Sequence, residues 1–231
     1  MGKINILSRS DEAFRDRKEA GRLLGEALYS LDLPQGDRTV VLGIPRGGVV
    51  VAKEAADILK ASLDIVLSRK LGAPRNPELA IGAISEAGEV FLDQWIVSST
   101  GADKKYIAEE AKHQSAEIVR RSKIFRKILP KTPLEQKTVI IVDDGLATGA
   151  TMQASLWAAR QEKPERLICA CPVASREAVE RIADYCDEAV CLRLPDFFGA
   201  VGQFYSSFGQ TTDAEVAGIL KEEFTKQMRH V

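Results

Sequence analysis

Two adjacent carboxylates and a run of small residues share one short segment, Val139 to Met152. Four β-branched residues precede Asp143 and Asp144, and the residues from Thr148 to Thr151 follow them. A run of β-branched residues is typical of a strand buried on both faces. Open α/β sheets bind ligands at the carboxyl ends of their strands, so we expect the two carboxylates to lie in a ligand site.

The small residues after the carboxylates suit a bound phosphate. Backbone N–H groups and two threonine hydroxyls can close around an anion there, and a helix N-terminus adds partial positive charge. The two carboxylates repel each other, and vicinal sugar hydroxyls or a hydrated divalent cation would relieve that repulsion. Each half has a simpler interpretation: an acidic pair also follows strands in metal-dependent receiver-like folds, and either threonine could be an ordinary helix N-cap. Neither interpretation readily explains both halves at this spacing.

The order of apolar strand, Asp-Asp, small residues and Thr-Gly-x-Thr resembles the signature of the type I phosphoribosyltransferases, which bind phosphoribosyl pyrophosphate (PRPP). The resemblance implies that Asp143 and Asp144 bind the ribose 2′- and 3′-hydroxyls. It also implies a Mg²⁺ cofactor, reached by the same two carboxylates through water or ribose. The residues expected to wrap the 5′-phosphate are Ala147, Thr148, Gly149, Ala150 and Thr151.

One departure from the family pattern concerns the acceptor. Enzymes of this family that act on 6-oxopurines carry an acid at the position of Ala147. Its absence argues against hypoxanthine or guanine, and the local string is closer to the adenine and orotate branches. The sequence names neither the acceptor nor a general acid or base.

A second segment, Gly43 to Gly48, ends an earlier apolar strand with Pro-Arg-Gly-Gly. The resemblance implies a pyrophosphate loop of unusual backbone conformation. In it Arg46 would contact the pyrophosphate, and Gly47 would let the backbone approach closely. By itself the string is equally typical of a glycine-rich turn with a surface arginine. Its place between a strand and a helix, upstream of the acidic segment, favours the pyrophosphate loop.

A third segment, Ser68 to Pro77, is typical of a basic loop after a strand. We expect Arg69 and Lys70 to point at the same anion and to act as catalytic residues that stabilise the leaving pyrophosphate. Arg75 would lie on a mobile portion, and Leu71 to Pro77 would close over the site and exclude water. The alternative is an exposed loop whose charges serve solubility.

Strands and helices alternate along the chain, which indicates a parallel sheet with helices on both faces. We predict an α/β fold of the phosphoribosyltransferase-like, Rossmann-like type, with a small C-terminal hood. The 231 residues suit one such domain over 1–231, with a helical insertion at about 95–135 and a hood at about 195–231. Strands are expected at 39–44, 63–68, 138–142, 166–171 and 188–192, with helices at 49–60, 103–129, 150–161, 175–184 and 213–228.

Aromatic residues gather in the expected hood, although they make up only 6% of the chain. In the resembled family a hood near the site holds the acceptor base, often by stacking. Ordinary packing or a dimer surface would explain the same residues. The candidates are Phe197, Phe198, Phe204 and Tyr205.

Charge and composition limit the partners. A net charge of −1 gives no general attraction to nucleic acid or an anionic membrane. Basic residues cluster late in the helix at 103–129, and we interpret them as a solvated face rather than a nucleic-acid patch, because acidic residues share the helix. No apolar run is long enough to span a bilayer, and no signal peptide is expected. The four cysteines lack zinc-site spacing and indicate small buried residues in a reducing cytoplasm.

Two functions fit these observations. The first is an enzyme, expected as a cytoplasmic homodimer, that transfers the phosphoribosyl group of PRPP to a nitrogenous acceptor with Mg²⁺ and releases pyrophosphate. The second is a non-catalytic regulator that binds PRPP or a nucleotide and acts on RNA or a protein partner. The basic residues Arg69 and Lys70 favour the enzyme. A metal-dependent phosphatase that uses the acidic pair is the least favoured interpretation.

Overall fold

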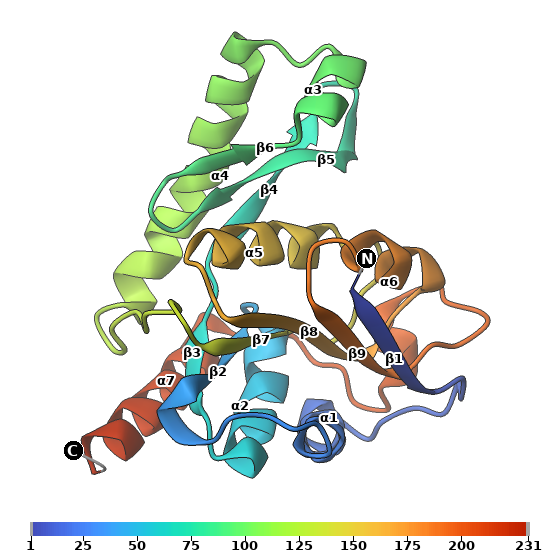
Figure 1. The fold of residues 1–231 in the computed structure, drawn as a ribbon, viewed down its shortest axis with the longest axis vertical. Coiled ribbons are helices and arrows are strands. Elements are labelled where there is room, and N and C mark those ends of the chain that lie inside the picture. The colour runs from blue at the N-terminus through green and yellow to red at the C-terminus, as the bar shows by residue number, and fades with distance from the viewer. Residues whose placement is uncertain (1, 230–231) are drawn as a thin grey trace.

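In the computed structural model, which describes residues 2–229, six parallel strands form a central sheet (Figure 1). The two strands that precede the expected ligand loops, β2 and β7, are neighbours in it. Every residue of these two strands is buried, as their apolar composition predicts. The order across the sheet is β1 (Lys3–Ser8), β9 (Glu188–Arg193), β8 (Arg166–Val173), β7 (Thr138–Val142), β2 (Thr39–Gly43) and β3 (Ser62–Ile65).

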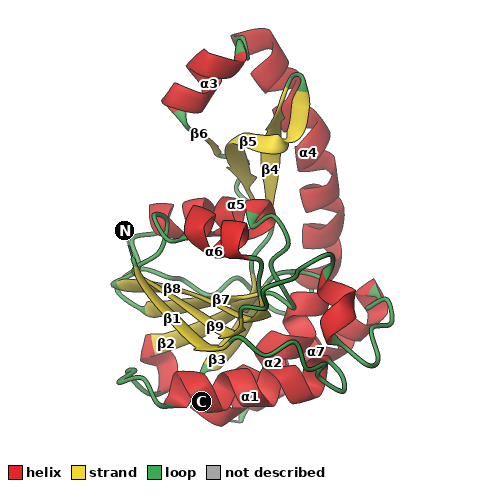
Figure 2. Ribbon diagram, turned by 90° about the vertical axis from the view of Figure 1, so that its right-hand side faces the viewer, coloured by secondary structure: helices red, strands yellow, loops and turns green. Residues whose placement is uncertain are grey.

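Helices cover both faces of this sheet (Figure 2). On one face lie α1 (Arg17–Tyr29) and α2 (Gly47–Leu59), and on the other lie α5 (Ala150–Gln161) and α6 (Arg176–Ile182). Successive side chains of a strand point to opposite faces, so β7 contributes to two separate cores. The α/β fold with a parallel sheet is confirmed.

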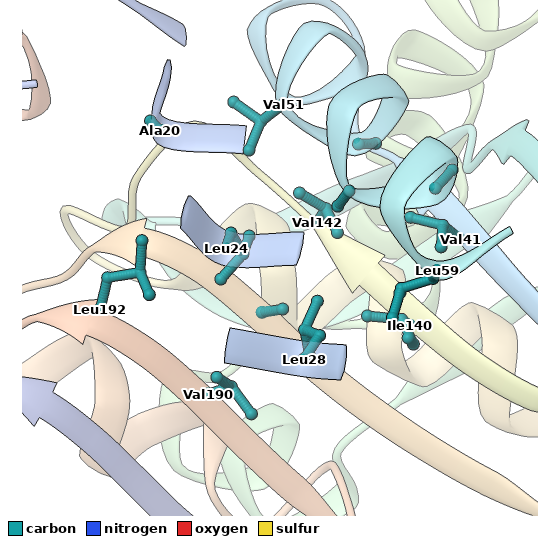
Figure 3. Packing of buried hydrophobic residues seen from close by; sticks show 14 of the residues in the cluster. Ala20, Leu24, Leu28, Val41, Val51, Leu59, Ile140, Val142, Val190 and Leu192 are labelled. Carbon is teal, nitrogen blue, oxygen red and sulfur yellow. The ribbon is translucent and has the colours of Figure 1, made fainter. Parts of the chain in front are cut away.

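The core between the sheet and α1 and α2 is built mainly from aliphatic side chains (Figure 3). Leu24 and Leu28 of α1 meet Ile140 of β7 and Val190 of β9 there. Burying a side chain of this size stabilises a fold by about 1.5–3 kcal/mol. The two helices lie so close that a Cβ on Gly21 would be 2.6 Å from the carbonyl oxygen of Val51.

A second structural unit, which we call the arm, comprises residues 68–125 and projects from the central sheet (Figures 1 and 2). Its antiparallel sheet is followed by two helices. Leu71, Ile81 and Phe125 of the arm belong to an apolar cluster that also includes Ile65 of β3, so we call it the apolar cluster of the arm. Its elements are β4 (Ser68–Ala73), β5 (Asn76–Ser85), β6 (Val90–Leu92), α3 (Gln94–Thr100) and α4 (Lys104–Phe125).

The arm corrects the expectation of a loop from Leu71 to Pro77. Those residues lie in two paired strands, β4 and β5, joined by a turn at 74–75. Strand β4 was missed because Ser68–Ala73 contains no β-branched residue, whereas strand propensity is highest for β-branched and aromatic residues. The expected helical insertion at about 95–135 holds α3 and α4, and the division into insertion and hood stays a prediction.

The C-terminal segment divides into two parts. A short 3-10 helix, η2 (Val201–Phe204), lies near the acidic segment, since the adjoining Tyr205 hydroxyl donates to the Asp144 carbonyl at 2.5 Å. The final helix, α7 (Asp213–Met228), instead packs Val216 and Leu220 into the apolar cluster of the arm. A further 3-10 helix, η1 (Gly36–Arg38), precedes β2. None of the helices within residues 2–229 has the length and apolar character needed to cross a membrane.

A buried ion-pair network joins the arm to the central sheet. Asp64 of β3 is 1% exposed, and Arg126 donates from Nη1 to its Oδ1 at 2.6 Å and from Nε to Glu86 at 2.9 Å. Burial raises the pKa of Asp64, while the charge of Arg126 opposes that rise. The sequence suggested that Arg126 belongs to a solvated helix face. That expectation is wrong, because the buried Asp64 and the partly buried Glu86 both pair with it.

We expect Arg126→Ala to lower the free energy of unfolding by about 3–5 kcal/mol, because it leaves Asp64 as a buried unpaired charge. Urea denaturation followed by circular dichroism measures this change. Lys127→Ala, at the exposed neighbouring position, is the matched control and should change stability by no more than about 0.5 kcal/mol. Equal stability of the two variants would contradict the stabilising role of the Arg126 ion pairs.

Candidate functional site

Two loops meet at the carboxyl ends of β2 and β7. The strands pair in register, with Gly43 opposite Val142. The backbone pairing continues one residue further, because the N–H of Ile44 donates to the carbonyl of Val142 at 2.9 Å. The loop from Pro45 to Gly48 is thereby placed against the acidic segment, as the sequence predicted from strand ends.

The contact between these loops leaves no room for a side chain. A Cβ on Gly47 would lie 2.0 Å from Asp144 Oδ2, and one on Gly48 would lie 2.7 Å from the carbonyl of Val142. Both separations are shorter than real Cβ contacts. A side chain at position 48 would therefore clash with the backbone of β7, and one at position 47 would displace the Asp144 carboxylate. The peptide bond between Pro45 and Arg46 is cis. Arg46 is half-buried at the N-cap of α2.

Asp144 is paired with an arginine from the start of α1. Arg17 donates from Nε to Asp144 Oδ2 at 2.7 Å, and the two side chains are 12% and 16% exposed. The guanidinium lies 3.9 Å from the ring centroid of Phe208, and its Nη1 donates to the carbonyl of Gly209 at 2.8 Å. This cation is therefore fixed by three different contacts.

Among the residues that the structure describes, Asp143 forms no ion pair like that of Asp144, although the charge of Arg17 acts to lower its pKa. Its Oδ1 accepts a hydrogen bond from the backbone N–H of Asp144 at 2.9 Å. Burial raises the pKa of Asp143 well above its ordinary value, and the neighbouring Asp144 carboxylate raises it further. Burial also raises the pKa of Asp144, although the hydrogen bond and charge of Arg17 oppose the rise. Such shifts are typical of functional sites, and hydroxyl donors or a cation would relieve the repulsion between the two carboxylates.

The expected phosphate loop leads into α5. Ala147 and Thr148 are exposed, and Gly149, with φ +72°, is the N-cap of α5. Thr148 Oγ1 accepts from the N–H of Ala150 at 3.4 Å, and the hydroxyl of Ser175 donates to the carbonyl of Ala147 at 2.6 Å. The loop thus presents exposed small residues at the N-terminus of a helix, which is the arrangement that binds anions.

A cavity of about 390 Å³ opens beside this loop. Its walls come from three places in the chain, namely the phosphate loop, the start of α6 and the segment after β9. Its polar lining includes Ser175, Arg176 and Asp196, and Phe198 supplies an aromatic ring. The cavity is thus polar on several sides and aromatic on another.

The four hood candidates do not form one aromatic surface. Phe197 is 92% exposed, whereas Phe204 and Tyr205 are buried in the core between the sheet and helices α1 and α2. Phe198 lines the cavity and stacks on Phe204 with ring centroids 5.3 Å apart. Of these four residues, Phe198 is therefore the one placed to contact a ligand in the cavity. Phe204 and Tyr205 are buried and do not line the cavity.

Arg69 and Lys70 occupy consecutive positions of β4, so their side chains point to opposite faces of the arm's sheet. This corrects the expectation that both point at the same anion, which assumed that the strand had already ended. Arg69 lines a small cavity of about 40 Å³ together with Pro45 and Thr151. Its Nε donates to Gln114 of α4 at 3.0 Å, so Arg69 is the residue placed beside both ligand loops.

Two arginines at the site were not predicted as site residues. Arg17 is 127 residues from Asp144 in sequence and lies in a charged stretch with no distinctive spacing. Arg121 was expected on a solvated face, yet it pairs with Glu117 and donates from Nη1 to the carbonyl of Pro45 at 3.0 Å. Hydrogen bonds from Arg120 and Arg121 lower the pKa of Glu117 to about 2. Arg121 thus connects the arm to the loop at Pro45.

The carboxylate pair fits a metal that arrives with its own ligands. Within residues 2–229, no group of three or more His, Cys, Asp and Glu side chains is placed to hold a metal ion. Mg²⁺ commonly binds one or two carboxylates and completes its octahedron with waters and substrate phosphates. Asp143 and Asp144 supply that number of carboxylates, so the donor set suits Mg²⁺ bound together with a phosphorylated ligand.

Comparison with known proteins places the chain in a family. The model of the phosphoribosyl transferase domain family matches residues 11–208, a range that includes both ligand loops. Curated relatives from two strains of Mycobacterium tuberculosis, provisionally named phosphoribosyl transferases, are 44% identical over 207 residues, which is 90% of this chain and 46% of theirs. The chain therefore spans about half the length of these relatives.

A solved structure shares both sequence and fold with this chain. The crystal structure of TT1426 from Thermus thermophilus is 48% identical, with a TM-score of 0.86, and the match covers 91% of this chain and 98% of that one. The similarity thus extends over the central sheet and nearly the whole of the solved chain.

We expect Asp143→Asn to raise the melting temperature at neutral pH, because it removes a buried charge beside Asp144. Since the folded-state pKa of Asp143 is raised above 3.8, its ionisation destabilises the fold at pH values above that folded pKa. The advantage of the variant should shrink as pH falls and vanish near pH 3.8, the ordinary value. Calorimetric melting temperatures between about pH 3.5 and about pH 8 measure the effect, and an advantage that grows toward acid would contradict it.

Proposed function

The chain belongs to the phosphoribosyltransferase family, and from this premise we propose that it transfers the phosphoribosyl group of PRPP to a nitrogenous acceptor and releases pyrophosphate. One observation carries the proposal. The carboxylate of Asp144 lies against Gly47, so the expected ribose site and the expected pyrophosphate loop are in contact. The exposed loop at Ala147 and Thr148 follows in the same segment.

The proposed roles follow the order of groups in PRPP. Asp143 and Asp144 accept hydrogen bonds from the ribose 2′- and 3′-hydroxyls, which relieves their mutual repulsion. The loop from Ala147 to Thr151 surrounds the 5′-phosphate with backbone N–H groups and threonine hydroxyls. The backbone at Gly47, with the Arg46 guanidinium, contacts the pyrophosphate.

The chemistry proposed for these residues is charge stabilisation. As the bond from C1′ to the pyrophosphate breaks, positive charge develops on the sugar and negative charge on the leaving group. Mg²⁺ bound with PRPP would neutralise part of the pyrophosphate charge. Arg46 and Arg69 stabilise the remaining negative charge on the pyrophosphate. Lys70 lies on the opposite face of β4 from Arg69, so it would reach the pyrophosphate only if the arm changed its conformation. The carboxylates and arginines hold and orient PRPP, and the proposal assigns no general acid or base.

The acceptor is proposed to occupy the cavity beside the phosphate loop. That cavity reaches Ala147, where no carboxylate is present to protonate a purine, and Phe198 offers a ring for stacking. Arg176 and Asp196 provide a donor and an acceptor for the polar edge of a base. The homodimer and the cytoplasmic location expected from the sequence remain predictions.

Titration calorimetry tests the PRPP site directly. We expect wild type to bind PRPP with Mg²⁺ and the variant Asp144→Asn with Thr148→Ala to bind at least about 100-fold more weakly, because each lost charged hydrogen bond is worth about 1.5–3 kcal/mol. Asp11→Asn with Thr225→Ala makes the same two chemical changes at exposed positions and is the control. Absence of PRPP binding by wild type would refute the proposal. Binding without pyrophosphate release by any acceptor would instead support the non-catalytic regulator.

A screen of nitrogenous bases for pyrophosphate release identifies the acceptor, and Phe198→Ala then tests its location. We expect the KM for the acceptor to rise about 5- to 150-fold, the effect of losing a base–aromatic stack of about 1–3 kcal/mol, with the KM for PRPP unchanged. Phe224→Ala, a partly exposed phenylalanine on α7, is the matched control. A rise confined to the KM for PRPP would place the acceptor elsewhere.

A further inference from the structure

Arg17 is a cation held rigidly at the edge of the candidate site. Its Nε binds Asp144, its Nη1 binds the carbonyl of Gly209, and its guanidinium lies over the ring of Phe208. The side chain is only 12% exposed. A guanidinium fixed in this way has already lost the rotamer freedom that a flexible surface arginine would lose on binding a ligand.

The fixed guanidinium faces the loop from Pro45 to Gly48. Arg17 Nε lies 2.8 Å from the position that a Cβ on Gly47 would take, directly beside Asp144 Oδ2 at 2.0 Å from the same point. Arg17 therefore approaches Gly47 from the side of α1, while Arg69 lies beside Pro45 on the side of the arm. The two arginines reach the same loop from different elements.

Part of the guanidinium is unused by the protein. Among the residues that the structure describes, Arg17 Nη2 makes no hydrogen bond, while Nε and Nη1 are both occupied. Its two N–H groups are donors in a rigid plane that suits phosphate oxygens. The two carboxylates next to it would repel a pyrophosphate, so an additional cation at this place offsets an electrostatic obstacle to PRPP binding.

We propose that Arg17 is a pyrophosphate-binding residue, anchored by Asp144, Gly209 and Phe208 and donating from Nη2 to the pyrophosphate group of PRPP beside Gly47. This inference rests on the proposed function, because it assigns a ligand contact within the same site. It predicts that one arginine serves two subsites: it pairs with the carboxylate that receives the ribose and binds the group that leaves.

A purely structural arginine would give a different result from a pyrophosphate ligand. If Arg17 acted only by orienting Asp144, its loss would weaken ligands that carry a ribose. If Arg17 contacts the pyrophosphate, its loss weakens inorganic pyrophosphate, which has no ribose to bind Asp144. Calorimetric titrations of PRPP, ribose 5-phosphate and inorganic pyrophosphate, each with Mg²⁺, separate the two roles.

We expect Arg17→Gln to weaken the binding of PRPP and inorganic pyrophosphate by about 10- to 100-fold, the range for a lost charged hydrogen bond. Ribose 5-phosphate, which feels only the loss of the Asp144 ion pair, should be weakened by a smaller factor than inorganic pyrophosphate. Arg17→Lys keeps the charge without the planar fork and should fall between wild type and Arg17→Gln. Arg22→Gln, at an exposed position of the same helix, is the control. Unchanged pyrophosphate affinity in Arg17→Gln, with weakened ribose 5-phosphate, would overturn the inference.

Removing Arg17 alone leaves the Asp144 carboxylate without its ion-pair partner. A second comparison, made in a protein that lacks this carboxylate, avoids the unpaired charge. In Asp144→Asn the carboxylate is replaced by a neutral amide while Arg17 is retained, and we expect pyrophosphate to bind at least as tightly as in wild type. Adding Arg17→Gln to Asp144→Asn should then abolish most of that affinity. Equal pyrophosphate binding by the single and double variants would refute the contact.

The failure of this inference differs from a failure of the proposed function. A wild-type protein that binds neither PRPP nor pyrophosphate would overturn both. A wild-type protein that binds PRPP, with Arg17 variants that bind PRPP and pyrophosphate equally well, would overturn only the role of Arg17.

Discussion

The contact between Gly47 and Asp144 is the constraint on which the arrangement of the site depends. Pairing of β2 with β7 aligns the ends of the two strands from which the two ligand loops begin. The hydrogen bond from the Ile44 N–H to the Val142 carbonyl extends that pairing into the loop from Pro45 to Gly48. The loops then meet so closely that a methyl group at Gly47 would overlap the carboxylate. Arg17 reaches the same carboxylate from α1, so three segments far apart in the chain are positioned by one close approach.

Electrostatic repulsion is built into this arrangement. Two neighbouring carboxylates are partly buried, and burial raises the pKa of each. A fold selected for stability alone would place apolar or paired groups at such positions. Arg17 offsets part of this repulsion through its ion pair with Asp144. In the proposed function, the ribose hydroxyls and the cation that bind with the ligand offset the remaining repulsion. The same side chains therefore oppose folding and favour binding.

The sequence predicted the features that follow from local pattern. The β-branched run before Asp143 indicated the central strand, and the small residues at Thr148 and Gly149 indicated the loop at the start of a helix; the structure has both. Features that depend on distant contacts were not predicted. The pairing of Arg17 with Asp144 has no sequence signal, since nothing in a charged helix start shows which arginine turns inward. Strand β4 was missed because its residues, Ser68–Ala73, are stabilised by pairing with β5 rather than by their own propensity.

The cavity beside the phosphate loop draws most of its walls from segments that play no part in the Gly47–Asp144 contact. Ser175 and Arg176 follow β8, and Asp196 and Phe198 follow β9, whereas the close contact is made after β2 and β7. Mutations in these walls therefore fall outside the segments that form the Gly47–Asp144 contact. In evolutionary terms, a duplicated gene of this type is free to drift toward a new small molecule on one side while selection holds the other side fixed.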